Sequence, residues 1–122
     1  METPSNKVFK DIFLANPNSV ELANVLWAPF RDGVEISVLY SASGGGISSA
    51  LLRYAAGARV PVHRHVGYEQ IFVLQGEQSD ERGSYPAGSV VVNLPGSSHW
   101  VNSAHGCIVL AVWEKPVEFV TE

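Results

Sequence analysis

Short segments of alternating apolar residues constrain the fold of this chain more than any other feature. In residues 34–40, VEISVLY, the even positions are apolar and two of the odd positions are polar. This is the period of a strand with one buried face. Similar segments recur along the chain, each bounded by Gly, Pro, Asn or Ser, which favour turns. Many short strands at close spacing predict an all-β sandwich or barrel.

The other expected elements follow from the same pattern. Strands are expected at residues 48–54, 62–65, 68–75, 89–93, 99–103 and 107–113, with a weaker strand at 24–27 and an edge strand at 118–120. Only residues 11–15 and 19–23 are expected to form short helical turns. Residues 41–46, SASGGG, are expected to be a mobile loop, because successive glycines leave the backbone too free to hold a regular element.

The length and composition fit one folded domain. A chain of 122 residues can bury one sizeable core without help from disulfides. The composition, 46% hydrophobic and 16% charged, does not favour disorder. We therefore expect a single domain over residues 1–122, with a barrel core at about residues 24–115 and flexibility at residues 1–6.

Charge and hydropathy exclude several classes of partner. The net charge is -4 and the eight basic residues are scattered, so no cationic stripe is available for nucleic acid. No apolar run approaches the roughly 18 residues that cross a bilayer. The first residues lack the basic and apolar regions of a secretory signal, and the single Cys107 cannot close an intrachain disulfide. These features predict a cytoplasmic protein without a membrane or nucleic-acid partner.

Three histidines and one glutamate are the main candidates for chemistry. His63 and His65 are two apart, and residues i and i+2 of a strand project from the same face about 6.5–7 Å apart, so both imidazoles can approach one ion. Glu69 begins the next strand after a turn at residues 66–68, and His99 comes from a distant strand. A single His or Glu is usually a surface or hydrogen-bonded residue. Here, however, three of the four histidines fall where one barrel would bring them together.

The spacing of these residues resembles the first motif of the cupin superfamily. The pattern G-x5-H-x-H-x3-E-x6-G is followed without departure by Gly57, His63, His65, Glu69 and Gly76. The two glycines are most simply read as turn residues that need a positive φ. The motif therefore contains both the residues that could chelate an ion and the turns that would position them.

The second cupin motif, G-x5-P-x-G-x2-H-x3-N, matches with small differences in spacing. Its glycine, proline and histidine correspond to Gly88, Pro95 and His99, with one residue extra before Pro95 and one fewer before Asn102. The closest likeness is to the ChrR-like cupins, the metal-binding domain of certain anti-sigma factors and their stand-alone relatives. The sequence segments that show this likeness are LR at 52–53, GA at 57–58, SDERG at 79–83, YPAG at 85–88 and PGSSH at 95–99.

The resemblance implies a double-stranded β-helix, the jelly-roll barrel of cupins, with one divalent metal ion per chain inside its mouth. The metal ligands that it implies are His63, His65, Glu69 and His99. Three imidazoles and one carboxylate suit Zn, Fe, Mn, Ni or Cu, so the ligand set leaves the identity of the metal open.

The leading functional prediction is a metal-dependent small-molecule oxidoreductase of dioxygenase type, acting on an oxygen-bearing substrate that chelates the ion. In this interpretation Glu69 is also a candidate general base if it can detach from the metal. By strand alternation, Ile71, Val73 and Val101 are expected to line an apolar pocket that excludes water.

Two other functions are open. The ChrR-like resemblance points to a non-enzymatic sensor that reports stress through its metal site and meets a protein partner in trans. The metal can also simply brace the fold, which ranks third because a metal in a barrel mouth usually remains reachable. The expected partners are a small-molecule ligand or substrate and a second copy of the chain. A homodimer is predicted because exposed sheet edges tend to pair, and residues 7–13 are apolar enough to cross onto a neighbour.

Overall fold

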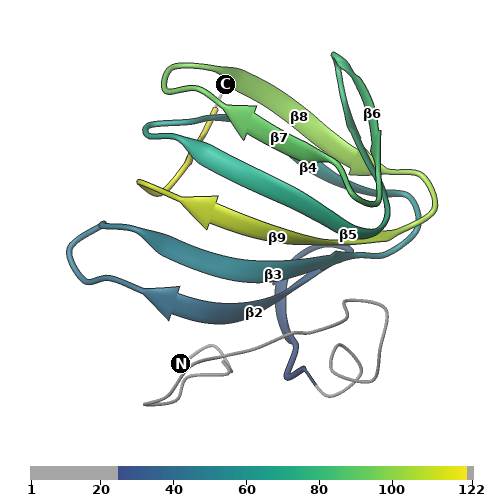
Figure 1. Cartoon of the computed structure of the whole chain (residues 1–122), viewed down its shortest axis with the longest axis horizontal. Helices are drawn as coiled ribbons and strands as arrows, with labels where there is room; N and C mark the ends of the chain where they lie inside the picture. Colours follow the sequence, from purple (N-terminus) through teal and green to yellow (C-terminus); the bar gives the residue numbers. More distant parts are fainter. Residues whose placement is uncertain (1–24, 121–122) are drawn as a thin grey trace.

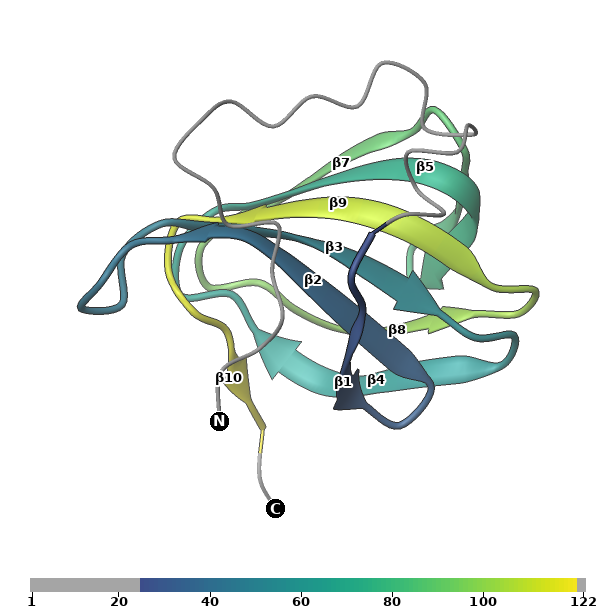
Figure 2. The same ribbon diagram turned by 90° about the horizontal axis from the view of Figure 1, so that it is seen from below.

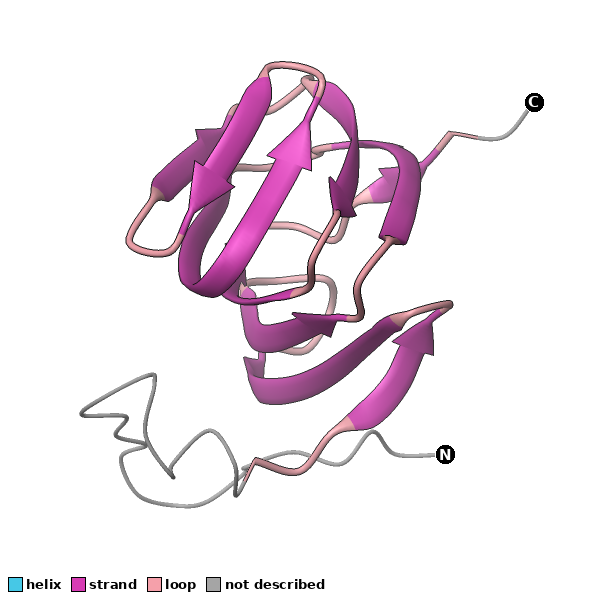
Figure 3. Ribbon diagram, turned by 90° about the vertical axis from the view of Figure 1, so that its right-hand side faces the viewer, coloured by secondary structure: helices cyan, strands magenta, loops and turns pink. Residues whose placement is uncertain are grey.

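The computed structural model describes residues 25–120, which form strands joined by loops and turns, with no helix in this part of the chain (Figure 3). None of these residues therefore belongs to a helix that could cross a membrane. The prediction of an all-β fold is confirmed. The strands are β1 Ala28–Arg31, β2 Val34–Ser41, β3 Ser48–Tyr54, β4 Ala58–Arg64, β5 Glu69–Asp80, β6 Gly83–Pro86, β7 Val90–Asn93, β8 Ser98–Ser103, β9 Cys107–Trp113 and β10 Glu118–Phe119.

The strands form a curled antiparallel sheet whose two layers face each other (Figures 1 and 2). One layer has the order β1-β2-β3-β9-β5, with β7 on the other side of β5. The second layer contains β8, β4 and β10, and β6 pairs with the end of β5. This arrangement confirms the double-stranded β-helix barrel.

Strand β5 belongs to both layers and changes layer near Gly76. Its first part, Glu69 to Gly76, pairs with β9, whereas its last part pairs with β6 and β8. Gly76 has a φ of 73°, and a Cβ atom there would lie 2.1 Å from the carbonyl oxygen of Gly106. Only glycine satisfies both the backbone conformation and the close approach of the neighbouring chain. The change of layer in β5 therefore requires glycine at position 76.

Alternate residues of the facing strands fill the barrel. Strand β9 is an example, since Cys107, Val109 and Ala111 are buried while the residues between them are half-buried. Complete burial of a side chain of valine size contributes about 1.5–3 kcal/mol. The buried apolar core consists of Ala28, Val34, Ile36, Ala50, Leu52, Tyr54, Ala58, Val60, Ile71, Val73, Val101, Cys107, Val109 and Ala111.

The structure differs from the sequence-based expectations mainly in strand bounds. Residues 25–27 of the strand expected at 24–27 belong to no strand, and neither β1 nor β6 was expected. Strand β5 continues beyond the expected end at residue 75, because the chain turns at Gly76 without losing its pairing. The helical turns expected at 11–15 and 19–23, the flexibility of residues 1–6 and the segment 7–13 all lie outside the described residues.

Candidate metal centre

Three histidines converge inside the barrel. His63 on β4 is paired in register with His99 on β8, and His65 lies one residue beyond the end of β4. The ring centroids are 5.2 Å apart for His63 and His65, and 4.7 Å apart for each of the other two pairs. One candidate ligand atom from each histidine lies within 4.8 Å of the others. All three side chains are buried, so the sequence spacing has produced one cluster.

Each histidine uses its Nδ1 atom to bind a neighbouring oxygen. His63 Nδ1 lies 2.9 Å from the carbonyl oxygen of Pro61. His65 Nδ1 lies 2.9 Å from the hydroxyl of Ser97, and His99 Nδ1 lies 2.9 Å from a carboxylate oxygen of Asp80. A hydrogen bond at Nδ1 fixes the ring orientation and leaves Nε2 to coordinate an ion.

The free Nε2 atoms fit a metal ion. Those of His65 and His99 are buried and have no hydrogen-bond partner. A buried polar atom without a partner costs about 1–3 kcal/mol, and a coordinated cation would remove that cost. Burial, with the neighbouring histidines, lowers the pKa of His63 despite its hydrogen bond to Pro61. That ring therefore favours the neutral form that a metal ligand requires.

Asp80 is the acidic partner of His99. Burial alone would raise the pKa of the Asp80 carboxyl, but hydrogen bonds from Arg82, His99 and Tyr85 hold it well below its usual range. The Arg82 guanidinium lies 2.6 Å from Asp80 Oδ2, and the Tyr85 hydroxyl donates to Oδ1 at 2.9 Å. Asp80 therefore remains a carboxylate that orients His99. The exposed Glu81 also comes close to this pair, but its carboxylate accepts the backbone N–H of Trp100.

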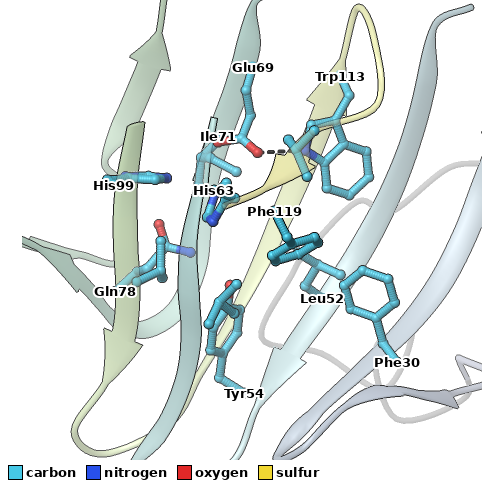
Figure 4. Close-up of a pocket in the computed structure, with 13 residues that line it drawn as sticks. Phe30, Leu52, Tyr54, His63, Glu69, Ile71, Gln78, His99, Trp113 and Phe119 are labelled. Atoms are coloured by element: carbon cyan, nitrogen blue, oxygen red, sulfur yellow. Dashed lines mark hydrogen bonds between the residues drawn. The ribbon is translucent and has the colours of Figure 1, made fainter. Parts of the chain in front are cut away.

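Glu69 lies beside the histidine cluster but outside the group of three. Its Oε1 atom is 3.1 Å from His65 Nε2, a close contact without hydrogen-bond geometry. Asn93 donates to Oε1 at 2.8 Å. The Trp113 indole donates to Oε2 at 2.5 Å (Figure 4). Burial opposes ionisation, but His65, Trp113 and Asn93 together lower the pKa of Glu69. The carboxylate is thus ionised and held toward the cluster.

A hydrogen-bonded chain connects Glu69 to Asp80. The Arg82 guanidinium donates to Asp80 and, at 2.6 Å, to the amide oxygen of Asn93. The amide nitrogen of Asn93 then donates to Glu69. The residue that orients His99 and the carboxylate beside His65 are therefore positioned by one network. The resemblance motifs contained Asp80 and Arg82 but gave them no role, and no sequence pattern indicated a role for Asn93 or Trp113.

A cavity of about 50 Å³ adjoins the cluster. Of the pocket residues expected from alternation, Ile71 and Val101 line it, whereas Val73 is buried in the core and is not among the lining residues. Two buried polar side chains, Tyr54 and Gln78, also face this cavity (Figure 4). Burial raises the pKa of Tyr54 above its usual range, so its hydroxyl remains protonated.

Two other residues singled out in the sequence lie away from the cluster. His105 is exposed in the turn between β8 and β9, as expected for the fourth histidine. Cys107 is buried in the core, which agrees with the role of a small apolar residue. Burial raises the pKa of its thiol.

Comparison with known proteins places these features in a family. The family model described as the ChrR Cupin-like domain matches residues 16–118. The chain belongs to the ChrR cupin-like family. Its curated relative, the anti-sigma-E factor ChrR of Cereibacter sphaeroides, is 33% identical over 100 residues, which are 80% of this chain and 46% of that protein. This ChrR-like cupin thus spans about half the length of that relative.

Solved structures agree with this assignment. The anti-sigma ChrR of Rhodobacter sphaeroides, determined in complex with SigE, has a TM-score of 0.68 and 32% identity, covering 75% of this chain and 51% of that one. An acetylacetone dioxygenase from Acinetobacter johnsonii has a TM-score of 0.75 and 17% identity, covering 100% and 86%. A putative acetylacetone dioxygenase from Methylibium petroleiphilum PM1 has a TM-score of 0.76 and 18% identity, covering 95% and 85%. The likeness to these two dioxygenases concerns the fold alone.

Proposed function

We propose that this ChrR-like cupin binds one divalent metal ion through His63, His65 and His99, with Glu69 as the fourth ligand. The observation that carries the proposal is the convergence of three buried imidazoles whose Nδ1 atoms are already bonded to other groups. Zn, Fe, Mn, Ni and Cu all accept such a donor set. Glu69 supports the proposal through its ionised state and its contact with His65.

The leading activity is that of a metal-dependent small-molecule oxidoreductase of dioxygenase type. A bound metal of this kind supplies a Lewis acid and a centre for oxygen chemistry. The apolar walls of the adjoining cavity, which include Ile71 and Val101, would exclude water from the reacting groups. Glu69 is the candidate proton acceptor if it detaches from the metal, because its carboxylate is ionised and adjoins the cavity.

The second candidate is a sensor that reports the state of its metal site to a protein partner. Its support is the 33% identity to an anti-sigma-E factor, a much closer sequence relation than that to either dioxygenase. In this role the metal centre would alter the surface of the barrel without converting a substrate. The two candidates share the metal ligands and differ in coordination number and in turnover.

Elemental analysis and X-ray absorption on protein purified without added metal would separate them. Iron, manganese, nickel or copper with five or six ligands favours the enzyme, because open positions remain for oxygen and substrate. Oxygen uptake would then be screened with diketones and phenolics. Closed four-coordinate zinc without oxygen uptake favours the sensor and would contradict the dioxygenase proposal.

The metal site itself is tested by the variants His63→Ala and His65→Ala. Each removes one imidazole of the cluster, so we expect the loss of stoichiometric metal binding, measured by elemental analysis after dialysis. His105→Ala is the matched control, because His105 is exposed and lies outside the cluster. Full metal content in either cluster variant would refute the site.

A further inference from the structure

The cavity beside the histidines is small and mostly apolar. Its volume is about 50 Å³, and Leu52, Val60, Ile71 and Val101 are among its walls. Because a water molecule needs about 10–15 Å³ on this measure, the cavity holds a ligand portion of about four non-hydrogen atoms. The enclosed part of the pocket therefore suits a small ligand group.

Tyr54 and Gln78 provide a second polar group in this cavity, away from the metal ligands. Tyr54 comes from β3 and Gln78 from the last part of β5, and each has only 5% of its surface exposed. Gln78 is close enough to the Tyr54 hydroxyl to lower its pKa slightly against the effect of burial. Figure 4 shows the Gln78 amide nitrogen and the Tyr54 hydroxyl directed into the space beside His63.

The position of the Gln78 amide leaves one donor of this pair available. When the Gln78 amide donates to the Tyr54 oxygen, the hydroxyl hydrogen of Tyr54 is left for another acceptor. A buried hydroxyl donor is stabilised by a partner, and a ligand oxygen in the cavity would supply one. The remaining walls near Tyr54 are mainly apolar.

The charge of the site favours an anion. Three neutral imidazoles, the carboxylates of Glu69 and Asp80, the Arg82 guanidinium beside Asp80 and a divalent ion together carry one positive charge. A buried net charge is costly unless an opposite charge accompanies it. A ligand with one negative charge would balance the site without displacing Glu69.

We propose that Tyr54 and Gln78 form the recognition subsite for a small monoanionic carboxylate, of about the size of acetate, that binds with one oxygen toward the metal-binding histidines and accepts a hydrogen bond from the Tyr54 hydroxyl. This assignment rests on the proposed metal centre. Tyr54 makes the direct contact, and Gln78 is a positioning residue that holds the hydroxyl in place.

The test uses the full chain loaded with Co²⁺ and titrated with acetate, with the visible absorption of the cobalt centre as readout. We expect saturable binding by the wild type and about ten-fold weaker binding by Tyr54→Phe, which keeps the ring and removes one hydrogen bond to a charged ligand. Gln78→Met should weaken binding by about three-fold, the smaller effect expected when only a positioning contact is lost. Tyr68→Phe, at an exposed tyrosine, is the matched control and should bind as the wild type does.

Two further readouts separate the possible failures. All variants should retain the wild-type cobalt content and thermal midpoint. If the wild type takes up no cobalt, the proposed metal centre and this subsite are both wrong. If cobalt is bound but acetate has no effect, or binds Tyr54→Phe as tightly as the wild type, only the subsite is wrong.

Discussion

Asp80 shows how one buried residue can control a metal ligand without touching the ion. Its carboxylate binds His99 Nδ1 and is itself held by Arg82 and Tyr85. Each of these donors favours the ionised form, which is why the pKa of Asp80 is low despite its burial. The orientation of His99 is therefore set by a residue on a different strand.

Removing the charge of Asp80 should weaken metal binding. We expect Asp80→Asn to lower metal affinity by about 10–100-fold, as for other partners that orient ligating histidines. Competition with a chromophoric chelator would measure this change. Asp32→Asn, at an exposed position, is the control, and equal affinities for both variants and the wild type would show that Asp80 does not position His99.

Cys107 should make stability depend on pH in the alkaline range. Burial raises the pKa of its thiol in the folded protein, whereas in the unfolded chain that pKa is about 8.5. Above that pH the unfolded chain loses a proton that the folded protein keeps, so the free energy of unfolding falls as pH rises. Urea unfolding at pH 7 and 9.5 should show a larger fall for the wild type than for Cys107→Ala. If the free energy of unfolding falls equally in the two proteins, Cys107 is not the source of this pH dependence.

At the level of the elements, β5 joins the two layers, because it pairs with strands of both. Its first part contributes Glu69 and Ile71 to the metal centre and the cavity, and its last part contributes Gln78 and Asp80. The change of layer at Gly76 brings these two groups to the same interior. The centre thus depends on a corner that contains no functional side chain.

Two glycines with similar backbone conformations allow this corner to be tested. Gly76→Ala should destabilise the protein by about 3 kcal/mol or more, because the strained conformation is combined with a clash against Gly106. Gly57→Ala should cost only about 1 kcal/mol, since its φ is 82° but no atom lies within 4 Å of the added Cβ. Urea unfolding would measure both changes. Similar losses would mean that strain, not the close approach of the chains, fixes Gly76.

At the scale of the whole molecule, strand β7 leaves an apolar edge. Within residues 25–120, β7 pairs with β5 alone. Val90, Val92 and Leu94 on or next to it are 56%, 47% and 59% exposed. Exposed edges of this kind are commonly covered by another chain. The edge supports the homodimer expected from the sequence, which remains a prediction.

Light scattering would test this assembly. We expect a mass of two chains for the wild type at micromolar concentration, and a shift toward monomer for Val92→Lys, because a buried lysine would oppose edge pairing. Ile47→Lys, at an exposed residue of the loop between β2 and β3, is the control. A monomeric wild type would refute the dimer.

The sequence by itself determined the strand period, most strand positions and the three histidines that converge, because alternation and motif spacing are local properties of the chain. Strand β9 has the predicted bounds, 107–113, and His63, His65 and His99 lie together. Only the tertiary structure decided the partners of those histidines, the network through Arg82 and Asn93, and the place of Tyr54 and Gln78 in the cavity. These contacts join residues on distant strands, and they depend on pairing register and on the corner at Gly76. A one-residue shift in register would turn each side chain to the opposite face.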